Sequence, residues 1–218
     1  MNDQAPIADL TNVIAEAASV YGVIPDIHPA DFVFQHSLSR NPNTRVVAKR
    51  YFDRGDYASK KLAEYIKRFS FQGKTVTSVL DFASGYGCVA RHFHRYLEES
   101  VKVVCCDIHE EAVAFIRDKL QIEAVRSGNK PEDLEVHETF DVIFTLSFFS
   151  HMPDATWGLW LKRLTDLLNP GGFILFTTHG YESLRRAAYP LNDFTGFRFS
   201  PSSEQRDLDT AEYGFTIL

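Results

Sequence analysis

The chain has 218 residues, 44% of them hydrophobic and 24% charged, which suits one sizeable core and is too short for two comfortable domains. Its formal net charge of −6 and pI of about 5.7 give no overall positive field toward nucleic acid. No apolar run approaches the roughly 20 residues that span a bilayer, so we expect neither nucleic acid nor a membrane as a partner.

The three cysteines indicate a reducing compartment. Cys88, Cys105 and Cys106 are too few for a disulfide framework, and their spacing is not that of metal ligands. We expect them to pack in the core and expect no metal site. The N-terminus also has no basic segment followed by an apolar one, so a cytoplasmic protein is expected.

Residues 1–77 are predicted to form a helical extension packed on a core of residues 78–218. Apolar spacing predicts helices at about 7–20 and 58–69, separated by a segment rich in Pro, Asn and aromatics. That segment is expected either to cover the active site as a lid or to pack as part of the extension. Most basic residues nearby should form a solvated helix face, but Arg50 or Arg54 could pair with an anionic substrate.

From residue 78 onward, apolar runs alternate with helical patterns. The apolar runs predict strands at 78–83, 101–107, 122–126, 140–147 and 173–178. Helical faces are predicted from Val89, Phe93 and Leu97, from Ala112, Val113, Ile116 and Leu120, and from Trp160, Leu161, Leu164 and Leu168. This alternation predicts a doubly wound α/β fold, with a mainly parallel, Rossmann-like sheet and helices on both faces.

Beyond residue 178 the pattern becomes irregular. One helix is predicted at 182–189 and one short strand at 215–218. Because the chain ends inside that strand, we expect the sequence to be a truncated form.

The residues that indicate function lie where the first strand gives way to a helix. The segment reads Val79-Leu80-Asp81-Phe82-Ala83-Ser84-Gly85-Tyr86-Gly87, and Asp107 closes the second predicted strand. Ligands of such folds bind beyond the carboxyl ends of the strands, and an acid at the end of the second strand can accept hydrogen bonds from a ribose.

Two cofactors fit this pattern. Gly85, Gly87 and Ala90 match the G-x-G-x-x-G/A fingerprint of dinucleotide binding, so a nicotinamide-dependent oxidoreductase is one alternative. Asp81 favours another ligand, because a carboxylate beside the loop would repel a pyrophosphate and attract an ammonium and a sulfonium. S-adenosylmethionine carries both cations and a ribose.

At these residues the sequence resembles the class I S-adenosylmethionine-dependent methyltransferases, over about residues 78–180. The glycine loop is similar to their D-x-G-x-G-x-G, and Leu167-Leu168-Asn169-Pro170-Gly171-Gly172 is similar to their L-x-P-G-G turn. The ending Thr177-Thr178-His179-Gly180 resembles bacterial small-molecule members. The resemblance implies S-adenosylmethionine as cosubstrate, held by Asp81, Ala83, Ser84, Gly85, Gly87, Asp107, Ile108, Asn129 and Ser147.

The sequence departs from this family at two places. Ala83 stands where the family has its first loop glycine, and alanine fits there if its φ is negative. The family fold finishes with an antiparallel strand pair, which we expect to be incomplete here.

The resemblance implies methyl transfer to a small molecule, and we favour O-methylation of a sugar or secondary metabolite. His151 follows the fourth strand and is the candidate general base, with His179 second and loop fastening as the alternative role. A nucleoside-binding module without transfer activity is the other alternative.

Overall fold

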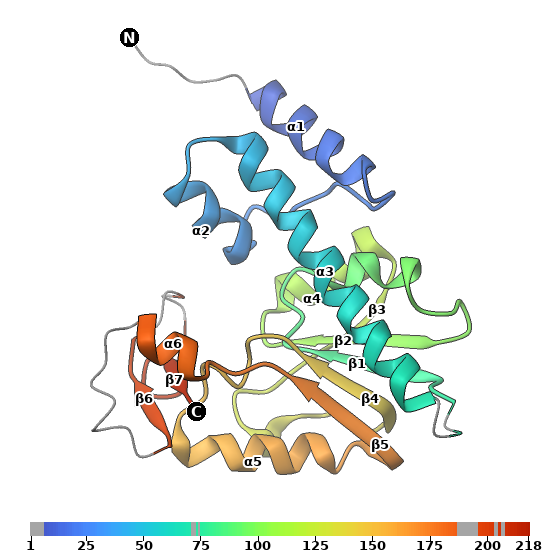
Figure 1. The fold of residues 1–218 in the computed structure, drawn as a ribbon, viewed down its shortest axis with the longest axis vertical. Helices are drawn as coiled ribbons and strands as arrows, with labels where there is room; N and C mark the ends of the chain where they lie inside the picture. Colours follow the sequence, from blue (N-terminus) through green and yellow to red (C-terminus); the bar gives the residue numbers. More distant parts are fainter. Residues whose placement is uncertain (1–6, 71–72, 74, 187–195, 203–204, 206–207) are drawn as a thin grey trace.

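Five parallel strands form the central sheet in the order β3-β2-β1-β4-β5 (Figure 1). The structure, a computed structural model, describes residues 7–70, 73, 75–186, 196–202, 205 and 208–218. The strands are β1 (Ser78–Phe82), β2 (Lys102–Asp107), β3 (Glu123–Arg126), β4 (Phe140–Thr145) and β5 (Leu168–Phe176). The predicted doubly wound, parallel, Rossmann-like fold is confirmed. Strand order reverses between β1 and β4, and folds of this kind bind ligands at that switch point.

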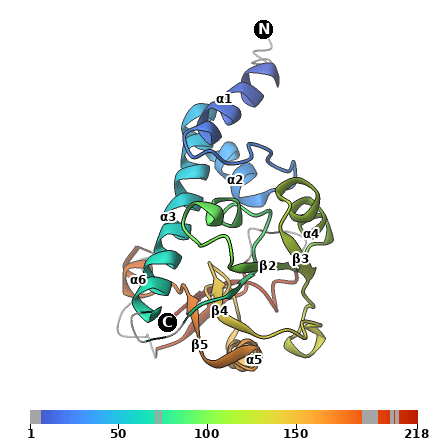
Figure 2. The ribbon, with the colours of Figure 1, turned by 90° about the vertical axis from the view of Figure 1, so that its right-hand side faces the viewer.

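Alternate side chains of the strands enter two separate cores. Val79 and Cys105 face one core, whereas Leu80 and Cys106 face the other. The first core is covered by α3 (Thr44–Ser70), η1 (Ala90–Arg95), α4 (Glu110–Phe115) and η2 (Ile116–Leu120). The second is covered by α5 (Asp154–Thr165) and by Leu134 and Val136, which follow η3 (Pro131–Asp133). Figure 2 shows α5 below the sheet and α3 and α4 above it. The cysteines of β2 are thus core residues, as predicted.

The helix expected around Val89, Phe93 and Leu97 is the six-residue 3-10 helix η1. His92 N donates to Val89 O at 2.9 Å, which is a three-residue step. That tighter repeat stacks Ala90 and Phe93 in the core, since residues three apart eclipse one another. Val89 and Phe93 are buried as predicted, but Leu97 lies beyond the end of the element.

The boundary between the last helix and its strand was also predicted wrongly. Helix α5 ends at Thr165, and Leu168 begins β5 instead of continuing the helical face. Leu168 pairs with Phe140 and Phe173 pairs with Val142, so a bulge takes up the Asn-Pro-Gly-Gly turn inside the strand. A Cβ on Gly172 would lie 2.7 Å from the Asp141 carbonyl oxygen, so this close approach requires glycine.

The N-terminal region contains α1 (Ile7–Ser19), α2 (Phe32–Arg40) and α3, which share a core of their own. Helix α1 was predicted, whereas α2 was missed and α3 begins fourteen residues before its predicted start, at 44 against 58. Side-chain caps explain both differences. Asp31 Oδ1 accepts a hydrogen bond from Phe34 N, and Asn43 Oδ1 accepts one from Val46 N, both at 3.1 Å. The division of the chain at residue 77 stays a prediction.

The last described segment contains α6 (Tyr181–Arg186) and a two-stranded antiparallel sheet of β6 (Arg198–Ser200) and β7 (Phe215–Ile217). The antiparallel pair, which the sequence predicted to be incomplete, therefore has both strands, and it forms a sheet separate from the parallel one. Residues 187–189 of the predicted helix at 182–189 lie outside the described residues. Among the described helices, none has the length and apolar character needed to cross a membrane.

His92 lies buried between η1 and the N-terminal helices and should make stability depend on pH. Neither ring nitrogen has a hydrogen-bond partner within the described residues, and burial lowers the pKa of His92 to about 4. Between pH 6.5 and 4 the unfolded chain binds a proton that the folded chain excludes, so the free energy of unfolding falls as pH falls.

Because of His92, we expect the free energy of unfolding to fall by about 3 kcal/mol from pH 6.5 to pH 4. In His92→Phe this fall in the free energy of unfolding between pH 6.5 and 4 should be absent. Urea unfolding of both proteins at several pH values measures it. An identical pH slope in both proteins would contradict the assignment.

Candidate active site

The loop after β1 is held in place by hydrogen bonds to β2. Ser84 N donates to Cys106 O at 3.0 Å, and Gly85 N donates to Asp107 Oδ2 at 2.7 Å. Gly85 and Gly87 have φ values of 56° and 70°, a region that favours glycine. A Cβ on Gly87 would lie 2.4 Å from Leu120 Cδ1, whereas the space beside Gly85 is open. The backbone at Gly85 can therefore approach a ligand.

Ala83 adopts a left-handed conformation with φ of 59°, so the negative φ at which alanine would fit without strain is not the one observed. The Ser84–Cys106 hydrogen bond fixes the next peptide and with it the turn. A left-handed conformation costs an L-residue about 1–2 kcal/mol, and glycine escapes this cost.

Ala83→Gly should therefore raise the free energy of unfolding by about 1 kcal/mol, measured by urea denaturation. Ala90→Gly is the matched control, because Ala90 lies buried in η1 and its loss should destabilise the protein. A lower stability of Ala83→Gly would show that the conformation of Ala83 is not strained.

Asp107 closes β2 with a nearly buried carboxylate whose orientation is fixed. Besides the bond from Gly85 N, its Oδ1 accepts a hydrogen bond from His109 N at 3.0 Å. Ser127 N, at the end of β3, donates to Asp107 O at 2.8 Å. His109 Nδ1 also lies 3.0 Å from Oδ1. A carboxylate has about four lone-pair sites, so about one site remains for a ribose hydroxyl.

Asp81, at the end of β1, is the electrostatic anomaly of the site. Its side chain is 2% exposed, and its Oδ2 has no hydrogen-bond partner among the described residues. Burial, together with repulsion by Asp107, raises the pKa of Asp81 to about 8. A buried carboxyl group without a donor is costly unless a ligand satisfies it, and a cation would do so.

Two other predicted contacts lie at the borders of this region. Ile108 is half-buried directly after Asp107. Asn129 is exposed and lines a cavity of about 190 Å³ together with Thr156 and Trp160 of α5. Contacts of Ile108 and Asn129 with adenine stay predictions.

The loop after β4 carries Ser147 and His151. Ser147 has φ of 63°, and its N–H donates to Thr177 Oγ1 at the end of β5, at 2.8 Å. His151 Nδ1 lies 2.6 Å from Gly214 O, and its ring stacks on Tyr213 at 4.6 Å. Because a carbonyl oxygen only accepts, Nδ1 carries the proton, and in the neutral ring Nε2 is the basic nitrogen.

His179 makes a parallel set of contacts to the same C-terminal segment. Its Nδ1 donates to Thr216 O at 3.1 Å, and its ring stacks on Phe215 at 4.3 Å. Both histidines therefore attach the strand ends to the segment that contains β7. The sequence showed neither attachment, because partners more than 30 positions away leave no local pattern.

Arg91 attaches the N-terminal region to the glycine loop. This is a second attachment that the sequence did not reveal. The buried Arg91 donates to Asp26 O at 2.8 Å, Ile24 O at 2.9 Å and Gly87 O at 3.1 Å. His28 stacks on Tyr86 of the loop with ring centroids 4.6 Å apart. The extension thus packs directly against the predicted cofactor loop.

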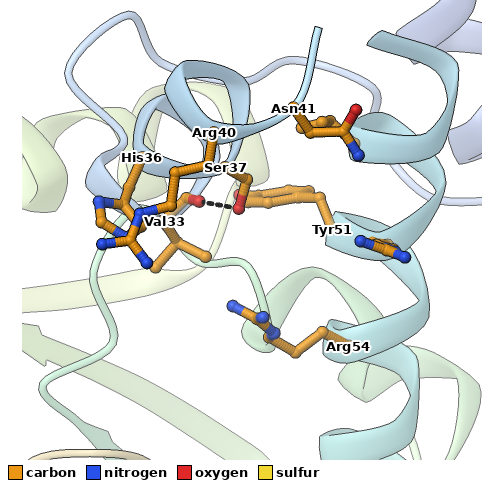
Figure 3. Close-up of a pocket in the computed structure, with 9 residues that line it drawn as sticks. Val33, His36, Ser37, Arg40, Asn41, Tyr51 and Arg54 are labelled. Atoms are coloured by element: carbon orange, nitrogen blue, oxygen red, sulfur yellow. Dashed lines mark hydrogen bonds between the residues drawn. The ribbon is translucent and has the colours of Figure 1, made fainter. Parts of the chain in front are cut away.

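A larger cavity of about 410 Å³ lies between α2 and α3 (Figure 3). It brings together Arg50 and Arg54, which the sequence had suggested for an anionic substrate, with Arg40 and His36 of the unpredicted helix α2. Its wall includes Tyr51, whose carbonyl oxygen accepts a weak hydrogen bond from Cys88 Sγ at 3.5 Å. Cys88 directly follows the glycine loop.

The reversed strand order, the glycine loop and the two acids define a nucleoside-binding α/β fold, and comparison with known proteins gives its class. Residues 79–172 match the methyltransferase domain family. The chain is 30% identical over 182 residues to the ubiquinone/menaquinone biosynthesis C-methyltransferase UbiE of Saccharophagus degradans, covering 77% of this chain and 71% of that protein. This chain belongs to the class I S-adenosylmethionine-dependent methyltransferases. The nicotinamide-dependent alternative is therefore wrong.

More distant relatives share parts of the chain. A ubiquinone biosynthesis O-methyltransferase of Nitrobacter winogradskyi is 27% identical over 100 residues, covering 46% of this chain and 38% of that protein. The solved plantazolicin methyltransferase BpumL in complex with SAH has a TM-score of 0.51 and 18% identity, covering 82% of this chain and 65% of that chain. The chain thus spans less than two thirds of both, and the second likeness shows the fold alone.

Proposed function

We propose that the protein transfers the methyl group of S-adenosylmethionine to a small molecule. The observation that carries this proposal is the buried, unpartnered carboxyl group of Asp81 beside the glycine loop. S-adenosylmethionine supplies an already activated methyl group on a sulfonium. In the step, a lone pair of the acceptor attacks the methyl carbon while the carbon–sulfur bond breaks, and S-adenosylhomocysteine leaves as a neutral thioether.

The chain's own residues would hold the donor by its charges and its ribose. Asp81 would receive the ammonium end, and the remaining lone-pair site of Asp107 would accept a ribose hydroxyl. The open backbone at Gly85 would lie against the ligand, with Ala83, Ser84 and Gly87 shaping the turn. Ile108 and Asn129 would contact adenine, and Ser147 would line the methionine end.

The acceptor atom that we propose is a hydroxyl oxygen of a sugar or secondary metabolite. A hydroxyl must lose its proton as the new bond forms, and His151 follows β4 at the carboxyl edge of the sheet, where an acceptor would enter. The hydrogen bond from Nδ1 to Gly214 supports this role, because it makes Nε2 the nitrogen that can take the proton. The relatives include one named as a C-methyltransferase and one as an O-methyltransferase, so their names do not decide the atom.

The direct test is transfer of labelled methyl from the donor to a panel of hydroxylated metabolites and sugar nucleotides. We expect labelled product with at least one hydroxyl acceptor and none with the methyl ether of the same compound. Transfer only to carbon or nitrogen acceptors would contradict the hydroxyl assignment. Donor binding without transfer to any acceptor would favour a nucleoside-binding module.

A further inference from the structure

The cavity between α2 and α3 is strongly basic in a protein of net charge −6. Its nine lining residues include three arginines and a histidine, and none is Asp or Glu: Val33, His36, Ser37, Arg40, Asn41, Val47, Arg50, Tyr51 and Arg54. We propose that this cavity binds an anionic group, a carboxylate or a phosphate, of the methyl acceptor. The assignment of the anion to an acceptor rests on the proposed function.

Arg50 and Arg54 carry the argument. They lie four residues apart on α3, so both project from one face of the helix toward the cavity. Neither forms an ion pair or hydrogen bond with any described residue. The two cations that precede them on the helix have acidic partners: Arg45 pairs with Glu16, and Lys49 with Asp53 at 2.6 Å. The two cavity arginines are thus left without an anion in a region where neighbouring cations have one.

The size and the basic lining of the cavity suit an anionic group carried by a small molecule. Figure 3 shows Arg40 reaching down from α2 and Arg54 reaching across from α3 toward the same space. The guanidinium groups of Arg50 and Arg54 each present paired N–H groups, which match the spacing of carboxylate and phosphate oxygens. The volume of about 410 Å³ lies within the range of small-molecule sites, and the acidic protein as a whole disfavours a polyanion.

Among the described residues that line the cavity, none is an acid. The carboxylate of Asp31 lies buried beside Tyr51, which is part of the cavity wall. Its Oδ2 accepts a hydrogen bond from the Tyr51 hydroxyl at 2.6 Å, and its Oδ1 caps α2 through Phe34 N. Asp31 is therefore already engaged in holding α2 onto α3.

The cavity also lies close to the predicted donor loop. Gly55, the residue after Arg54, packs so tightly that an added Cβ would lie 2.1 Å from Cys88 O. Tyr51 contacts Cys88 as well, and Cys88 follows Gly87 in the chain. An anion held by Arg50 and Arg54 would therefore leave the rest of a small acceptor beside the glycine loop, with α2 above it.

The test compares anion binding by three proteins at constant ionic strength. The melting temperature is measured with added pyrophosphate in the phosphate arm and with added malonate in the carboxylate arm. Sodium chloride keeps the ionic strength constant. The variants are Arg50→Gln/Arg54→Gln and the matched control Lys60→Gln/Lys67→Gln, which removes two exposed charges from the same helix. At ten times its Kd, a bound anion should raise the melting temperature by about 3–6 °C.

We expect this rise in the wild type and the lysine control, in the phosphate arm, the carboxylate arm or both, and no rise in the arginine variant. The arm that responds identifies the anionic group. No rise in either arm, or an equal rise in the arginine variant, would overturn the proposal.

Calorimetry with S-adenosylhomocysteine separates this proposal from the proposed function. We expect equal affinity in all three proteins, because the arginines hold the acceptor and not the donor. An anion response without binding of S-adenosylhomocysteine would refute the methyltransferase proposal and with it the acceptor role of the cavity. Binding of S-adenosylhomocysteine without any response to the anions would refute the cavity proposal alone.

Discussion

Asp81→Asn should weaken the binding of S-adenosylhomocysteine about 10- to 100-fold. The variant keeps the size of the side chain and removes the charge that would pair with the ligand ammonium, an interaction worth about 1.5–3 kcal/mol. Isothermal titration calorimetry at pH 7 measures the affinity. Asp118→Asn, which removes an exposed carboxylate on η2, is the matched control and should bind like the wild type.

The same titration should detect the release of a proton on binding. With its pKa raised to about 8, Asp81 is mostly protonated in the free protein at pH 7, and pairing with a cation would lower that pKa. Binding should then release close to one proton, and affinity should rise up to about tenfold per unit between pH 6 and 7.5. Titrations in buffers with different ionisation enthalpies measure the release, which Asp81→Asn should abolish. A wild type that binds without proton release would contradict the assignment of the ammonium to Asp81.

The raised pKa also has a consequence for the free protein. A carboxyl group whose folded pKa exceeds its unfolded pKa stabilises the fold at low pH, and this contribution is lost as pH rises from about 4 to 8. A cationic ligand reverses the loss, because it stabilises the charged form. Ligand-induced stabilisation should therefore grow with pH over the same interval.

His151→Ala should reduce turnover about 100- to 10,000-fold while leaving donor affinity unchanged, if His151 takes the proton of a hydroxyl acceptor. The wild-type rate should rise with pH as the imidazole loses its proton, and the variant should lack this dependence. Steady-state kinetics with the acceptor found by screening, over a range of pH, measure both effects. Added imidazole should restore part of the turnover of the variant.

His179→Ala distinguishes a role of His151 as a base from a role in attaching the C-terminal segment. Both histidines donate Nδ1–H to a carbonyl of residues 214–216 and stack on a ring of the same segment, so both losses should lower the melting temperature alike. Only His151→Ala should lose the pH dependence. Full turnover in His151→Ala, or equal losses in the two variants, would eliminate the base assignment and leave positioning as the role of His151.

The strands were the most predictable part of the fold. Strands buried on both faces read as continuous apolar runs, which is why β1 to β4 lie within two residues of their predicted bounds. The sequence was less informative where tertiary contacts decide the local geometry. The bulge in β5 depends on the pairing of Leu168 and Phe173 with β4, and the early start of α3 depends on the cap by Asn43.

The candidate donor site was predictable for a similar reason. Asp81, Gly85 and Asp107 lie at adjacent strand ends, and parallel strands bring such ends together. The α2–α3 cavity and the attachments of Arg91, His151 and His179 join segments that are distant in the sequence. No periodicity or motif encodes such contacts, so they become visible only in the folded chain.

The central claim is that the glycine loop and its two acids form a donor site, and a ligand comparison by calorimetry tests it most directly. We expect the wild-type protein to bind S-adenosylhomocysteine, with one site per chain, and to show no heat of binding with oxidised nicotinamide adenine dinucleotide under the same conditions. Equal or tighter binding of the dinucleotide, or no binding of S-adenosylhomocysteine, would contradict the account.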